Sequence, residues 1–234
     1  MAGSMDSRRL AYLKALDVDV WERRGLAPVA VAAAVAAPVP DSSAQPGWAE
    51  LERAVKGCTL CPLYKTRTQG VFGVGNRNAQ WMVIGEAPGV DEDRQGEPFV
   101  GRAGQLLNSM LKAIGLAREQ VFIANILKSR PPNNRDPRPE EVRACIPYLF
   151  RQIELVNPRL ILCVGRIAAQ TLLETDTPIG KLRGQLHRIA GNRPMIVTYH
   201  PAYLLRSPGE KRKSWADLLL AMRTFEQLAG GAPT

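Results

Sequence analysis

Histidine and cysteine are scarce in this chain of 234 residues, which contains two histidines and four cysteines. In a chain without a recognisable signal peptide, four cysteines are more often found at a metal site or in catalysis than in a disulfide framework. Aromatic residues make up only 6% of the sequence. A lone aromatic residue in an acid-rich loop, such as Phe99, is therefore a candidate for binding a ligand.

Long apolar runs are also missing. No stretch of the sequence reaches the length that a membrane span needs. Residues 10–20 are interrupted by Lys14, Asp17 and Asp19, which is unlike the apolar core of a signal peptide. We therefore expect a cytoplasmic protein that does not associate with membranes.

Acidic residues are outnumbered by basic ones. The chain has 31 Lys and Arg against 22 Asp and Glu, which gives a formal net charge of +9. This balance favours polyanionic partners, with nucleic acid first and acidic membranes second.

The sequence predicts two regions. Residues 6–24 have leucines at near-helical spacing, and residues 28–47 are rich in Ala, Pro, Val and Ser. We therefore divide the chain into an N-terminal helix and flexible Ala/Pro-rich linker (1–47) and one domain (48–234).

Four apolar runs in the second region predict a sheet. A buried strand over 81–84 is followed by the loop 85–103, and a helix begins near Gly104. Further strands are expected at 121–126, 159–165 and 195–199, and helices at 48–56, 104–114, 139–156, 166–174 and 211–228. Strands that alternate with helices favour a parallel sheet with helices on both faces.

Polar side chains stand where these strands end. The loop after the first strand carries Glu86 and Glu92, Asn125 ends the second strand, and His200 follows the fourth. Open α/β sheets bind ligands at the carboxyl ends of their strands. An isolated histidine is more often structural and Asn125 could be a satisfied core amide, but their positions favour a binding site.

Cys58 and Cys61 form a CxxC pair directly after the predicted helix 48–56. Two thiolates at this spacing can bind one metal or cluster. A redox-active pair is the alternative, although this pair precedes the first clear strand.

Six motifs in order carry a family resemblance: CTLCPL, GEAPGVDED, EPFVGRAGQLL, ANILKSRPPNNRDP, EEVRAC and HPAYLLR. From about residue 48 to 228, the sequence resembles the family 4 uracil-DNA glycosylases, the iron–sulfur branch of their superfamily. The resemblance implies a three-layer α/β/α sandwich with a four-stranded, mainly parallel central sheet. It also implies a repair hydrolase that removes uracil from DNA, single- or double-stranded, and leaves an abasic site.

The resemblance further implies roles for individual residues. Phe99 would stack on the flipped uracil, Asn125 would pair with its Watson–Crick edge, and His200 would lie near O2. Leu204 would fill the emptied space in the duplex. The other pocket residues would be Gly85, Glu86, Ala87, Pro88, Gly89 and Asn134. Phosphate contacts are expected from Arg102, Lys128, Arg130, Arg135 and Arg206, although any one of these could equally be a solvated surface residue.

The residue types suit this chemistry. The Asn125 amide offers a donor and an acceptor, which matches uracil but not cytosine. A neutral His200 could donate a hydrogen bond to the uracil anion that leaves the sugar. Either Glu86 or Glu92 could position the attacking water, and the sequence does not decide between them.

One departure concerns the iron–sulfur cluster. The resemblance implies a 4Fe-4S cluster held by four cysteines, of which Cys58, Cys61 and Cys145 are present. Ser129 stands at the fourth position, while Cys163 falls in a predicted buried strand and is the less favoured replacement. A cluster with three cysteines and Ser129 or an outside ligand, and no cluster at all, are both open.

Three other functions compete. The chain could be a superfamily sibling with hypoxanthine or mismatch specificity, a non-catalytic nucleic-acid-binding module, or a redox-sensing iron–sulfur protein. The first expectation remains a monomer that acts on DNA containing uracil.

Overall fold

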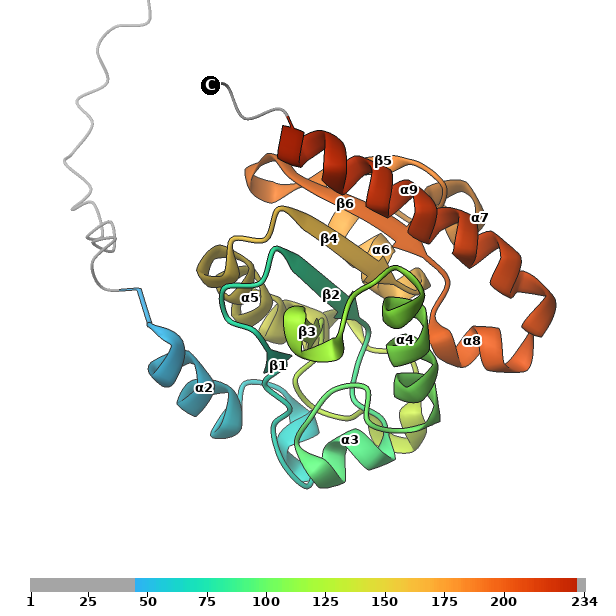
Figure 1. Cartoon of the computed structure of the whole chain (residues 1–234). Coiled ribbons are helices and arrows are strands. Elements are labelled where there is room, and N and C mark those ends of the chain that lie inside the picture. Colours follow the sequence, from blue (N-terminus) through green and yellow to red (C-terminus); the bar gives the residue numbers. More distant parts are fainter. Residues whose placement is uncertain (1–44, 231–234) are drawn as a thin grey trace, which may run out of the picture. The chain divides into compact units, whose positions relative to one another are not determined.

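The computed structural model describes residues 45–230, and within it a compact unit begins at Pro46 (Figure 1). Its sheet has six strands in the order β1-β3-β2-β4-β6-β5. The strands are β1 (Val74–Gly75), β2 (Trp81–Gly85), β3 (Phe122–Asn125), β4 (Leu160–Val164), β5 (Leu186–Ile189) and β6 (Arg193–Thr198).

The four inner strands, β3, β2, β4 and β6, are parallel, and they are the four that the sequence predicts. Two antiparallel edge strands bring the count to six, so the expected four-stranded sheet is corrected in number but not in class. Neither edge strand has a strand signal in the sequence. β1 contains two residues, and only Ile189 of β5 is buried, so neither contributes an apolar run.

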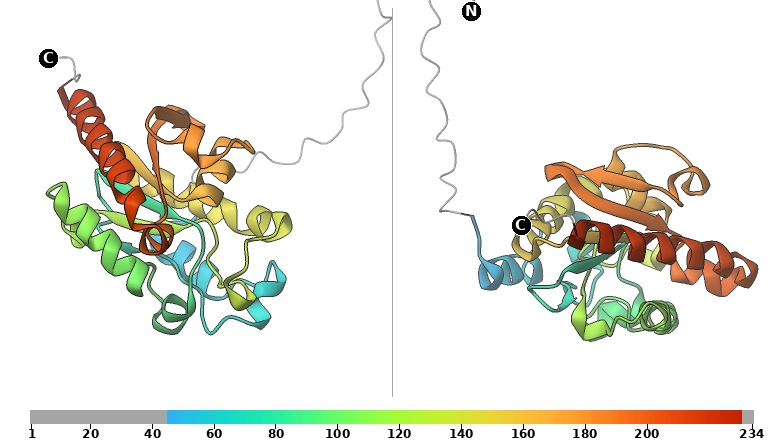
Figure 2. Two further views of the ribbon diagram at one scale, coloured as in Figure 1. Left: turned by 90° about the vertical axis from the view of Figure 1, so that its right-hand side faces the viewer. Right: turned by 45° about the horizontal axis from the view of Figure 1, so that its top comes forward.

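Helices cover both faces of the sheet, which confirms the three-layer α/β/α class (Figure 2). Buried residues of α2, α5, α6 and α7 pack on one face, and those of α4, α8 and α9 pack on the other. The helices are α2 (Trp48–Lys56), α3 (Val90–Gln95), α4 (Arg102–Ala113), α5 (Pro139–Val156), α6 (Arg166–Leu173), α7 (Ile179–Leu182), α8 (Pro201–Arg206) and α9 (Lys211–Gly230). Single 3-10 turns are η2 (Pro62–Lys65), η3 (Arg118–Gln120), η4 (Pro132–Asn134), η5 (Ala190–Asn192) and η6 (Pro208–Glu210).

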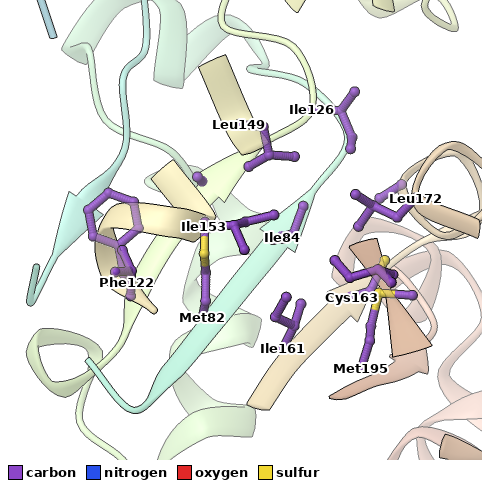
Figure 3. Close-up of a cluster of buried hydrophobic side chains, with 14 of the residues drawn as sticks. Met82, Ile84, Phe122, Ile126, Leu149, Ile153, Ile161, Cys163, Leu172 and Met195 are labelled. Carbon is purple, nitrogen blue, oxygen red and sulfur yellow. The ribbon is translucent and has the colours of Figure 1, made fainter. Parts of the chain in front are cut away.

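The inner strands are buried on both sides, and their side chains alternate between two apolar clusters. In β4, Ile161 and Cys163 point into the cluster beneath α5 and α6 (Figure 3). Leu160, Leu162 and Val164 belong to the cluster beneath α4 and α9. Because the inner strands are packed on both faces, their carboxyl ends are held in fixed positions, and so are the loops that begin there.

One local expectation is wrong, because the loop predicted at 85–103 contains α3. α5 continues through Pro147, the position at which the sequence predicts a kink. The helix predicted at 6–24 and nearly all of the linker predicted at 28–47 lie outside the described residues. Among residues 45–230, no helix is long and apolar enough to cross a membrane.

Candidate active site

The carboxyl ends of the four parallel strands meet at a cavity of about 740 Å³. Each strand delivers a lining residue: Glu86 follows β2, Asn125 ends β3, Gly165 follows β4 and His200 lies just beyond β6. The cavity therefore lies where open α/β sheets bind ligands. Of the other expected pocket residues, Ala87, Pro88, Gly89, Phe99 and Asn134 line it too, whereas Gly85 does not.

Glu86 is half-buried at the cavity, and within residues 45–230 its carboxylate has no hydrogen-bond or ion-pair partner. Its pKa is raised to about 7, because burial and the charge of Asp136 raise it by more than the charge of Arg166 lowers it. Asp136 and Arg166 form an ion pair of 2.8 Å that also lines the cavity. A free carboxylate that titrates near neutral pH suits a general base.

Glu92 has a different environment. Its Oε1 accepts hydrogen bonds from the backbone N–H groups of Val100 and Gly101, both at 3.0 Å. Its Oε2 accepts from the N–H of Gly89, also at 3.0 Å. Both oxygens therefore hold the loop around the cavity, which distinguishes the two carboxylates that the sequence left equivalent.

His200 is held in one orientation at the start of α8. Its Nδ1 accepts a hydrogen bond from the N–H of Ala202 at 3.1 Å. The pKa of His200 is lowered to about 4, because burial and the charge of Arg206 lower it by more than the charge of Glu92 raises it. The ring is therefore neutral near pH 7, and because Nδ1 is the acceptor, Nε2 carries the hydrogen.

Phe99 and Asn125 meet across Gly85. The rings of Phe99 and His200 are tilted by 30°, with their centroids 5.6 Å apart. A Cβ on Gly85 would lie 2.5 Å from the Phe99 ring and 2.6 Å from Asn125 Oδ1, so only glycine permits this approach. Asn125 Oδ1 is buried and has no hydrogen-bond partner in the described part of the chain. An unpaired buried acceptor is costly, and a ligand that donates to it would remove that cost.

A comparison of the sequence with models of known protein families gives one match that spans the cavity residues. The family model of the uracil DNA glycosylase superfamily matches residues 72–219, a range that includes Glu86, Phe99, Asn125 and His200.

The chain belongs to the uracil DNA glycosylase superfamily.

Its similar relatives include type-4 uracil-DNA glycosylases. The one from Archaeoglobus fulgidus is 48% identical over 175 residues, which cover 72% of this chain and 88% of the relative. The one from Pyrobaculum aerophilum is 44% identical over 178 residues, covering 73% of this chain and 91% of the relative. The one from Thermotoga maritima is 46% identical over 154 residues, covering 65% and 80%. The superfamily member described here therefore groups with the type-4 family.

The four arginines that were expected to contact DNA differ from one another in exposure and in hydrogen bonding. Arg102 and Arg206 are exposed, and Arg206 lines the cavity. Arg130 donates from Nε to Asn134 Oδ1 at 2.8 Å. Arg135 binds the buried Glu141 with both terminal nitrogens, so much of its donor capacity is used within the protein.

Two of these expectations are wrong. Lys128 is only 1% exposed, and its Nζ donates to Asn125 O at 2.8 Å and to Gln152 Oε1 at 2.6 Å, so it cannot reach a DNA phosphate. Leu204 is also 1% exposed and packs beneath α4 and α9, so it is not presented as a wedge. The neighbouring Leu205 is the exposed leucine of α8.

Two tyrosines of the site were not predicted. Tyr199 and Tyr203 line the cavity, and their ring centroids lie 5.0 Å apart. They flank His200 in the sequence, and that position at a strand end was the available signal.

The cysteines form a second candidate site, beside α5. Cys61 and Cys145 share a buried cluster with Leu63 and Leu127. Burial raises the pKa values of both thiols, and the nearby Cys58 raises them further. Cys163 belongs to β4, and its side chain lies in the apolar cluster beneath α5 and α6, as predicted for a buried strand.

Ser129 is already bonded within the protein. Its Oγ accepts a hydrogen bond from Arg67 Nη1 at 2.8 Å. Nη2 of the same guanidinium donates to the carbonyls of Lys56 and Cys58 at 2.8 and 2.9 Å. In the described range, no three His, Cys, Asp or Glu side chains are arranged to hold a single metal ion. Three thiols fit an iron–sulfur cluster, but a hydroxyl tied to a guanidinium does not fit its fourth ligand.

Proposed function

We propose that this chain is a uracil-DNA glycosylase that binds a flipped-out uracil and hydrolyses the bond between its N1 and the deoxyribose C1′. The unpaired acceptor of Asn125, buried at Gly85 where the Phe99 ring also approaches, is the observation that carries this proposal. A base must leave the stack to be reached, and a pocket with one aromatic face and one amide suits a single base. The names of the type-4 relatives support the same substrate.

Asn125 would read the base edge. Its unpaired Oδ1 would accept from uracil N3–H, and its Nδ2 would donate to O4. Cytosine has an acceptor at N3 and a donor at C4, so both contacts would become mismatched. Phe99 would stack on the ring plane and hold it between these groups.

Bond cleavage would develop two opposite charges. The electrons of the C1′–N1 bond pass to the uracil, and the sugar gains oxocarbenium character. The Nε2–H of neutral His200 would donate to uracil O2 and stabilise the departing anion. The Glu86 carboxylate would orient a water, accept its proton as the water attacks C1′, and so leave an abasic site.

The cofactor would be a 4Fe-4S cluster bound by Cys58, Cys61 and Cys145. Such a cluster supplies a cross-link between the CxxC segment and α5, and no step of the hydrolysis uses it. Because Ser129 is tied to Arg67, we do not assign it as the fourth ligand. Four cysteines without a disulfide in the described structure fit a cytoplasmic protein, and we propose that it acts there as a monomer.

The test is base release from single- and double-stranded DNA that carries uracil, hypoxanthine or neither. We expect uracil release by the wild type, and losses of at least about 100-fold in Glu86→Gln and in a His200→Asn variant. Glu226→Gln is a matched control, because Glu226 is exposed on α9, away from the cavity.

Two of the rival functions predict different results in this assay. Release of hypoxanthine in preference to uracil would identify a sibling specificity. DNA binding without release of any base would identify a non-catalytic module. Full activity in Glu86→Gln would remove that carboxylate from the mechanism.

A further inference from the structure

Phe99 has an unusual backbone conformation. Its φ is 56°, in the left-handed region that bulky side chains rarely adopt. Such a residue costs free energy and persists only where its surroundings hold it in place. The side chain that would stack on the base is therefore presented by a backbone that needs support.

Arg118 supplies that support from outside the cavity. It is the first residue of η3, and its side chain does not line the cavity. Its Nη1 donates to the carbonyl of Phe99 at 3.2 Å and its Nη2 to the carbonyl of Pro98 at 2.5 Å. Nη1 also donates to Asn108 Oδ1 at 3.2 Å, which fixes the guanidinium against α4. Two parallel donors on one rigid group match two consecutive carbonyls.

Glu92 holds the same segment through its amides. Its Oε1 accepts from the N–H groups of Val100 and Gly101, the two residues that follow Phe99. The backbone of α4 also packs directly against Phe99 at Gly104, since a Cβ there would lie 1.8 Å from the Phe99 carbonyl oxygen. A guanidinium, a carboxylate and a helix backbone together define where the Phe99 ring stands.

We propose that Arg118 is a positioning residue for base excision, which acts only by holding Phe99 in its stacking position. This inference rests on the proposed function. Without the guanidinium, the carbonyls of Pro98 and Phe99 lose their donors. Glu92 still holds the amides of Val100 and Gly101, but the backbone of Phe99 itself is then free to relax toward an ordinary φ. The ring then leaves its place at the cavity opposite His200.

The test is a double-mutant cycle of Arg118→Met with Phe99→Ala, measured by uracil release and by inhibition with free uracil. In the wild-type background, Arg118→Met should lower kcat/KM and weaken uracil inhibition by roughly 5- to 150-fold, the range of one lost base stack. In the Phe99→Ala background, the same change should have an effect of less than about twofold, because its target is absent. Affinity for uracil-free DNA should stay unchanged in every variant.

Arg118→Lys keeps the charge but not the two-pronged geometry, so we expect a smaller loss that also vanishes in the Phe99→Ala background. It replaces Arg118→Met in the cycle if the latter does not fold. Arg223→Met is the matched control, because Arg223 is exposed on α9 and should tolerate the change. Equal losses in both backgrounds would overturn the inference. If the wild type released no uracil at all, the proposed function itself would fail, which is a separate outcome.

Discussion

The cavity and the cysteine site differ in how many of their polar groups are already paired. At the cavity, the Glu86 carboxylate and Asn125 Oδ1 have no partner among residues 45–230. At the cysteine site, the Ser129 hydroxyl is bonded to Arg67. A protein leaves buried polar groups unpaired where a ligand completes them, since otherwise the unmet bond only costs stability. The cavity is therefore built for a ligand, while the fourth corner of the cysteine site is closed by the protein.

The two sites are joined by one short segment. Asn125 ends β3 at the cavity, and Ser129 lies four residues later at the cysteine site. Between them, the buried Lys128 donates to the carbonyl of Asn125 and to Gln152, which in turn donates to the carbonyl of Phe72 at 2.8 Å. This network, like the Arg67 bonds, consists of protein groups alone. The cavity should therefore keep its geometry whether or not a cluster is bound.

The largest effect should come from changing the unpaired carboxylate at the cavity. Glu86→Gln should lower the rate of uracil release by about 10²- to 10⁴-fold, because the base is lost. In the wild type, the rate should rise about tenfold per pH unit below 7 and level off above it, since the pKa of Glu86 is about 7 and its charged form is the active one. Single-turnover rates from pH 5 to 9 give this profile. A flat profile would contradict the assignment.

The same carboxylate should make the protein less stable at high pH. Its folded pKa of about 7 is above the ordinary value of 4.5, so the folded state binds the proton more tightly. Stability is therefore fully present below about pH 4.5 and falls as pH rises through 7, by up to about 3 kcal/mol. Relative to the wild type, Glu86→Gln should gain melting temperature at pH 8.5 and gain none at pH 4.5. A gain of equal size at both pH values would point to a cause other than this titration.

The next effect concerns the unpaired amide. Asn125→Asp should lower kcat/KM for uracil roughly 5- to 150-fold, because the donor to O4 is replaced by an acceptor. This range corresponds to the loss of about 1–3 kcal/mol of transition-state stabilisation. The measurement is release from matched uracil and cytosine substrates. Unchanged uracil kinetics would show that Asn125 does not read the base.

A smaller effect on activity, but a clear one on composition, should follow at the cysteine site. Ser129→Cys should raise iron and sulfide content and visible absorbance, because it completes the thiolate set. Uracil release should change by less than about twofold, since the pocket has its own supports. Cys163→Ala is the control and should leave iron content unchanged. If Cys163→Ala emptied the site while Ser129→Cys had no effect, Cys163 would be a ligand.

The smallest effect is on the salt dependence of DNA binding. Arg206→Met should reduce the slope of log affinity against log salt by about 0.9 if the exposed Arg206 contacts one phosphate. Lys128→Met should leave the slope unchanged because Lys128 is buried. Binding titrations on uracil-free duplex between 50 and 200 mM salt, roughly the range over which counterion release is evident, compare the two. Equal changes in slope would mean that Lys128 reaches the DNA.

The sequence predicted the parallel strands because each is a continuous apolar run, and it predicted Glu86, Asn125 and His200 because each follows such a run. Its predictions for Lys128 and Leu204 were wrong, because charge and size are visible in a sequence while burial depends on how the elements of the fold pack. It could not separate Glu86 from Glu92, since their difference lies in backbone amides that a fold brings together. Short elements such as β5 and α3 lack enough residues for a periodic signal.

The contact between Gly104 and the Phe99 carbonyl also constrains motion. Side chains between two elements can change rotamer and let those elements slide, but here the α4 backbone touches the loop with no side chain between them. While Arg118 also ties the loop that carries Phe99 to Asn108 of α4, this loop should move only together with the whole helix, which is anchored beneath by Leu107 and Leu111. We expect no independent flap over the cavity. The speed at which a base enters would then be set by how readily the DNA opens, and flexible or mismatched steps in the duplex should be processed fastest.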